Sequence, residues 1–119
     1  MTIAIPASAR CHLWLEEAPD DLGGETFERL HTYVDDSHLI RRLLRCTDCG
    51  QLYFYEFHEE VDYADGEDPQ YRSYIPVTDE ADAATLAKMM PFELLTFTPR
   101  LQRDFPQGAE HPSVCWIGK

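Results

Sequence analysis

The sequence predicts an α+β domain in which a small antiparallel sheet, built on one long hairpin, is accompanied by several short helices. Residues 51–61 alternate aromatic side chains with Glu and His, which is the period of a strand that has two different faces. Residues 71–77 have similar β-forming character, and the dipeptide Asp65-Gly66 between the two segments favours a turn. Thr78 followed by acidic residues is typical of a helix start, which supplies the α component.

The segment before the hairpin predicts a short strand followed by two helices. We expect the strand over residues 11–16 and the first helix over residues 25–34. Ser37 can cap the second helix, which carries an apolar stripe and has arginines near its negative C-terminal end. The stripe consists of Leu39, Ile40, Leu43 and Leu44, and the arginines are Arg41, Arg42 and Arg45. The same residues also match a strand that leads into the cysteine motif at 46–49.

After the hairpin, the sequence predicts further helices and a final strand. The helix that Thr78 caps is expected to end before Pro91, where a new segment begins. Thr98-Pro99 has the cap and the proline of another helix start. Residues 113–117 predict a short strand that carries the last cysteine of the chain.

The length of 119 residues is that of one domain, so we expect residues 1–119 to form a single folded unit. No stretch reaches the roughly 20 apolar residues of a membrane helix, and the start of the chain lacks the basic and apolar regions of a signal peptide. We therefore expect a cytoplasmic protein without membrane attachment. Thiols stay reduced in the cytoplasm, so the four cysteines are expected to act as ligands or catalysts rather than as two disulfides.

The motif Cys46-Thr47-Asp48-Cys49-Gly50 is the strongest site signal in the chain. Two thiolates at this spacing can bind one metal ion, and Gly50 can adopt the left-handed conformation that such a turn requires. A thioredoxin-like redox pair would need its nucleophilic cysteine at a helix N-terminus, whereas an aromatic strand follows here, and Asp48 disfavours a thiolate. The motif therefore predicts a metal knuckle rather than a redox centre.

This stretch resembles a rubredoxin-type zinc knuckle, as found in zinc ribbons and treble clefs. The resemblance covers residues 46–50 and the strand that follows, and it implies zinc as the cofactor. A zinc ribbon has a second C-x-x-C motif, which this chain lacks, so the other two ligands have to come from separate elements. The expected ligands are Cys11, Cys46, Cys49 and Cys115. His12 and His111 are the substitutes if one cysteine does not reach the ion, and the alternative is that Cys11 and Cys115 are ordinary buried thiols.

The chain is strongly acidic, with 22 Asp and Glu against 10 Lys and Arg. Such a surface repels phosphate backbones, which argues against nucleic-acid binding, and it attracts basic proteins. Aligning Gly66 with the invariant glycine of a calcium-binding loop places Val61, Tyr63 and Arg72 where carboxyl ligands belong, so the calcium pattern fails. Tyrosine is a frequent interface anchor, and the acidic hairpin is rich in it. The expected partner-binding residues are Glu56, Glu59, Glu60, Asp62, Asp65, Glu67, Asp68, Tyr63 and Tyr71.

The chain has no nucleophile elbow, phosphate loop, dinucleotide fingerprint or H-E-x-x-H motif, so we expect a protein that is not an enzyme. A small acidic chain without catalytic motifs resembles bacterial toxin-immunity proteins, including those of contact-dependent inhibition, and this resemblance rests on the composition of the whole chain. It implies a zinc-stabilised protein that neutralises a basic partner such as a cognate toxin. The alternatives are a small zinc metalloenzyme with three protein ligands and a water at the metal, and a structural subunit of a larger complex.

Overall fold

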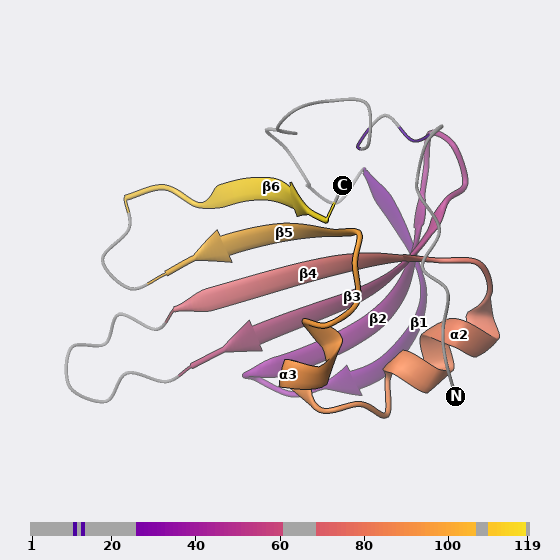
Figure 1. The fold of residues 1–119 in the computed structure, drawn as a ribbon. Helices are drawn as coiled ribbons and strands as arrows, with labels where there is room; N and C mark the ends of the chain where they lie inside the picture. The colour runs from indigo at the N-terminus through magenta and orange to yellow at the C-terminus, as the bar shows by residue number, and fades with distance from the viewer. Residues whose placement is uncertain (1–10, 12, 14–25, 61–68, 107–109, 119) are drawn as a thin grey trace.

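A six-stranded antiparallel sheet with two short helices on one of its faces makes up the described part of the chain (Figure 1). The computed structural model describes residues 11, 13, 26–60, 69–106 and 110–118. Each strand pairs with its neighbour in the sequence, in the order β1-β2-β3-β4-β5-β6. The strands are β1 Phe27–Asp35, β2 Leu39–Cys46, β3 Leu52–Glu59, β4 Gln70–Val77, β5 Arg100–Phe105 and β6 Ser113–Ile117. The helices α2 (Glu80–Leu86) and α3 (Pro91–Leu94) lie between β4 and β5 in the chain.

The prediction of an α+β fold with several helices is wrong, because the described residues are mainly β. Residues 25–34, expected as a helix, lie mostly in β1, and residues 39–45 take the alternative strand form as β2. Leu43 and Leu44 show why the pattern was ambiguous. They belong to different cores on opposite faces of the sheet, so β2 lacks the apolar–polar alternation that marks a strand with one solvated face.

The central hairpin and the C-terminal strand are confirmed. β3 pairs with β4 in one continuous antiparallel register, and β6 covers the residues predicted for it. The expected helix after Thr98-Pro99 is wrong, because the residues from Arg100 onward form β5 and pair with β4. The turn within residues 61–68, and most of the strand expected over residues 11–16, lie outside the described residues.

The helix predicted from Thr78 is confirmed, with a cap one residue further on. Asp79 is the N-cap of α2, and its carboxylate accepts a hydrogen bond from the backbone N–H of Asp82 at 2.9 Å. The segment expected to begin at Pro91 is the short helix α3. At seven and four residues, neither of these described helices has the length needed to cross a membrane.

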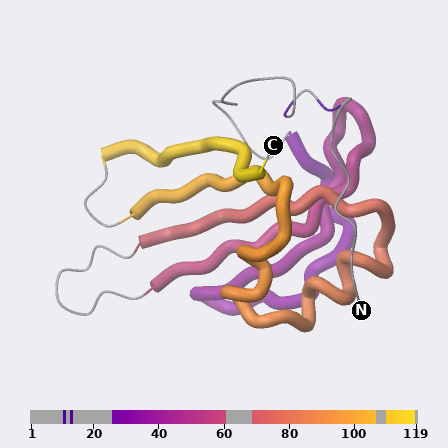
Figure 2. The backbone as a smooth tube through the Cα atoms, in the orientation of Figure 1, coloured from indigo at the N-terminus to yellow at the C-terminus, as the bar shows by residue number. Residues whose placement is uncertain are grey.

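A separate apolar core packs against each face of the sheet. The first core joins the sheet to α2 and α3, which lie along one side of the strands in Figure 2. Its buried members are Leu43, Phe54, Ile75, Val77, Ala83, Leu86 and Leu94. The buried members of the second core are Cys11, Leu13, Leu44, Cys46, Tyr53, Tyr74 and Leu101. Because successive strand residues such as Tyr53 and Phe54 point to opposite faces, the second core, with its two cysteines, lies on the face away from the helices.

Buried polar side chains form a row across the helix-covered face of the sheet. Arg41, Glu56, Ser73 and Gln102 stand opposite one another on successive strands from β2 to β5. Arg41 donates to one Glu56 carboxylate oxygen from Nε at 2.8 Å and from Nη2 at 2.7 Å. The Ser73 hydroxyl donates to the Gln102 amide oxygen at 2.9 Å. Arg41 also donates to the carbonyl of Ala87 at 2.9 Å, so the row attaches the chain after α2 to the sheet.

Candidate metal centre

The motif at residues 46–50 forms the turn between β2 and β3, and backbone hydrogen bonds fix its shape. The Cys46 N–H donates to the Gln51 carbonyl at 2.9 Å, and the Gly50 N–H donates to the Cys46 carbonyl at 2.9 Å. Gly50 has a φ of 83°, the left-handed conformation that its position after the second cysteine predicted. The turn therefore holds the two cysteines of the motif in a defined arrangement.

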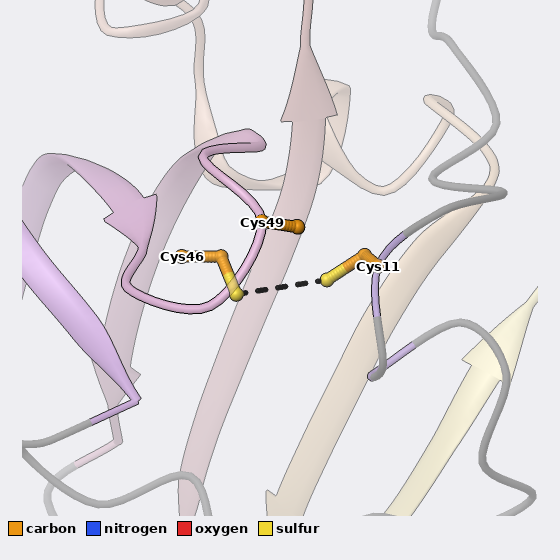
Figure 3. A group of neighbouring side chains, drawn as sticks. All are labelled: Cys11, Cys46 and Cys49. Carbon is orange, nitrogen blue, oxygen red and sulfur yellow. Dashed lines mark hydrogen bonds between the residues drawn. The ribbon is translucent and has the colours of Figure 1, made fainter.

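Three of the four predicted ligands come together at this turn (Figure 3). The sulfur atoms of Cys11, Cys46 and Cys49 all lie within 4.8 Å of one another, and the Cys11 thiol donates to the Cys46 sulfur at 3.8 Å. Cys11 and Cys46 are each only 1% exposed, whereas Cys49 is exposed. Three soft sulfur ligands from two distant parts of the chain form a group that can hold a metal ion.

Cys115 does not join this group in the part of the chain that the structure describes. It lies on β6 between Val114 and Trp116, which both pack against the second core. Because successive strand residues point to opposite faces, Cys115 points to the helix-covered side of the sheet, where it is exposed. Of the two predicted substitutes, His111 is exposed and outside the group, and His12 lies outside the described residues.

The C-terminal strand is tied to the cysteine group through Trp116 instead of Cys115. The Trp116 indole Nε1 donates to the Leu13 carbonyl at 2.7 Å, two residues beyond Cys11. The Trp116 ring packs against the same core that contains Cys11. No sequence motif marks this contact, because it depends on which face of β6 meets the second core.

The Cys11 thiol lies in an environment that favours its neutral form when no metal is bound. Burial raises the pKa of Cys11 to about 12, although hydrogen bonds from the Tyr53 hydroxyl and the Leu13 backbone oppose part of this rise. A metal ion bound by Cys11 therefore has to displace a proton from this sulfur.

We expect the apparent affinity of this cysteine group for a soft metal ion to fall as the pH is lowered. Well below the pKa of Cys11, the fraction of its thiolate falls about tenfold per pH unit, so the affinity should fall by at least that factor. Competition with a chromophoric chelator at several pH values measures the affinity, and calorimetry in buffers of different ionisation enthalpy counts the protons released. Cys115→Ser should leave this dependence unchanged. An affinity that does not vary with pH near neutrality would mean that Cys11 is not a ligand.

The predicted partner-binding residues do not share one exposed surface in the described part of the chain. Glu56 is buried in its ion pair on the helix-covered face. Glu59 accepts a hydrogen bond from the Gln70 amide at 2.7 Å, which lowers the pKa of the Glu59 carboxyl. Glu60 is exposed and Tyr71 is half-buried. The other predicted residues, Asp62, Tyr63, Asp65, Glu67 and Asp68, lie outside the described residues.

Comparison with known proteins shows no significant similarity. No protein-family model matches the chain, and neither the curated proteins nor the solved structures contain a match. The features of the chain that bear on its function are therefore the cysteine group, the net charge and the surface of the fold.

Proposed function

We propose that Cys11, Cys46 and Cys49 bind a zinc ion. Tetrahedral zinc with Zn–S bonds of about 2.3 Å places its sulfur ligands about 3.8 Å apart. The sulfur atoms of Cys11 and Cys46 are separated by 3.8 Å, and this agreement is the observation that carries the metal assignment. Thiolates also suit zinc better than they suit the hard cations magnesium and calcium.

The proposed zinc ion stabilises the fold by joining segments that are far apart in the sequence. Cys11 comes from the N-terminal part of the chain, and the other two ligands come from the turn between β2 and β3. The hydrogen bond between Trp116 and Leu13 adds β6 to the same junction. Because two of the three cysteines are buried, the site has the character of a structural zinc centre more than of one that admits substrate.

We infer that the chain is a non-catalytic binding protein that neutralises a basic protein, such as a cognate bacterial toxin, in the cytoplasm. The net charge of -12 supports this function, because it speeds association with a positively charged partner and repels nucleic acid. Inhibition by occupying a surface needs a stable complementary face and no reacting groups. A sheet that a metal ion stabilises at the turn between β2 and β3 can provide such a face.

We expect the complex with this partner to weaken as salt is added. The zinc-loaded chain, immobilised at low ionic strength, should retain a basic protein from its source cells. The dissociation constant measured with that purified protein should rise at least about tenfold between 0.05 and 0.5 M salt, because the charges on the two surfaces become screened. An unrelated protein of equal net charge serves as the control for non-specific attraction. Failure to retain any basic protein, or an affinity independent of salt, contradicts the proposed function.

The grouping of three cysteines also supports a second candidate, a zinc enzyme with three protein ligands and a water at the metal. Three thiolates outweigh the charge of the ion, however, which weakens its ability to acidify a bound water. X-ray absorption on the zinc-loaded chain separates the candidates. A fourth ligand from the protein supports the structural site, whereas an exchangeable oxygen ligand supports the enzyme.

A further inference from the structure

Exposed apolar side chains concentrate on α3 and its two ends. Phe92 is 67% exposed, Met90 55% and Leu95 50%, the highest values among the large apolar side chains of the described residues. Phe92 and Leu95 are three residues apart and therefore share a side of the helix, while Leu94 is buried in the first core. Met90, Phe92 and Leu95 are called the α3 patch below. Exposed apolar side chains gathered in this way on a soluble protein often mark an interaction site.

Hydrogen bonds hold the backbone that carries the α3 patch. At the start of α3, the N-cap N–H donates to the Glu93 carboxylate at 3.0 Å. At its end, Arg100 of β5 donates to the Leu95 carbonyl at 2.7 Å. Before α3, Arg41 of β2 donates to the Ala87 carbonyl at 2.9 Å. The sheet therefore fixes the segment on both sides of the patch, and a surface that is already ordered loses less entropy when it binds.

The charges of the segment around α3 and of the whole chain indicate which kind of molecule can bind the α3 patch. Residues 78–100, which include Arg100 at the end of the patch, contain four acidic side chains against one lysine and one arginine. The acidic residues are Asp79, Glu80, Asp82 and Glu93. A second copy of the chain would bring another net charge of -12, so self-association through the patch is disfavoured by repulsion. A basic protein with an apolar depression matches both the aromatic side chain at the surface and the acidic residues in the same segment.

We propose that the α3 patch is the contact surface for a basic protein, with Phe92 as its central anchor. This inference rests on the proposed function, and it moves the expected contact from the acidic hairpin to α3. In Figure 1, α3 lies far from the turn between β2 and β3 that carries the metal motif. Substitutions in the patch can therefore be tested without disturbing the zinc ligands.

Photo-crosslinking tests this contact in the full-length, zinc-loaded chain. Phe92→benzoylphenylalanine is expressed in the source cells, and the crosslinked protein is identified by mass spectrometry. Leu30→benzoylphenylalanine is the matched control, because Leu30 is also an exposed apolar residue but lies on β1. We expect a basic protein to be crosslinked from position 92 and not from position 30. A crosslink from position 92 to a second copy, to an acidic protein or to no protein overturns the proposal.

Titration of the crosslinked protein, once purified, separates this inference from the proposed function. Phe92→Ala should raise the dissociation constant about 30-fold, as at an aromatic hot spot, while zinc content and unfolding stay as in the unmodified chain. Leu30→Ala should change the dissociation constant less than about twofold. If Phe92→Ala binds normally and binding still weakens with salt, the proposed function stands and the α3 patch is not the contact. If the unmodified chain binds no basic protein at any salt concentration, both proposals are wrong.

Discussion

Cys46→Ser is expected to release the metal ion and to lower the free energy of unfolding by several kcal/mol. Cys46 ends β2 within the second core, and its sulfur lies 3.8 Å from that of Cys11. Structural zinc in small domains contributes on the order of 10 kcal/mol, so the loss should exceed that of an ordinary core substitution. The measurements are the zinc content of the purified chain and its denaturant-induced unfolding. Removal of zinc from the unmodified chain by a chelator should have a similar effect.

Cys115→Ser is the matched control, because it makes the same chemical change at a cysteine outside the group. Cys115 is exposed on the other face of the sheet, so the variant should keep its zinc and unfold within about 0.5 kcal/mol of the unmodified chain. If Cys115→Ser loses zinc as Cys46→Ser does, the four-cysteine site expected from the sequence is right and the three-cysteine group is incomplete. If Cys46→Ser retains both zinc and stability, the proposed zinc site is wrong.

Part of this site could be predicted because its chemistry is local. The spacing of Cys46 and Cys49 and the glycine after them are sufficient to predict the turn, since only neighbouring residues determine its shape. Neighbouring residues do not determine whether Cys11 or Cys115 joins Cys46 and Cys49. That depends on which face of β6 meets the second core, and a shift of one residue along β6 would exchange Cys115 with Trp116.

The fold was predictable where one segment has an unambiguous period and a turn, as in the hairpin of β3 and β4. It was not predictable in β2, because apolar residues at neighbouring positions match both a helical stripe and a strand buried on both faces. β1 is an edge strand whose residues are all exposed or half-buried, so its sequence has no apolar period that would mark a strand. Composition also did not predict which residues of a segment are exposed and which are buried. Glu56 was expected on an acidic partner-binding surface but is buried, and Phe92, whose burial the sequence pattern does not predict, is exposed. Only tertiary packing distinguishes these positions.

Glu56→Ala is expected to destabilise the fold by about 3–5 kcal/mol, the usual result of leaving a buried charge without its partner. The Arg41 and Glu56 side chains are 5% and 6% exposed, so water cannot replace the lost carboxylate without opening the helix-covered face. Arg41 would keep only its bond to the Ala87 carbonyl among the bonds described for its guanidinium. The free energy of unfolding in denaturant measures the effect.

The pair of Arg45 and Glu28 provides the control, because it is also an Arg–Glu ion pair but is exposed to solvent. Its side chains are 46% and 51% exposed, and Glu28→Ala should therefore cost less than about 1 kcal/mol. In the double variant Arg41→Met with Glu56→Leu, no charge is left unpaired, so much of the stability lost in Glu56→Ala should return. If Glu56→Ala costs no more than Glu28→Ala, then the row of buried polar residues does not stabilise the sheet.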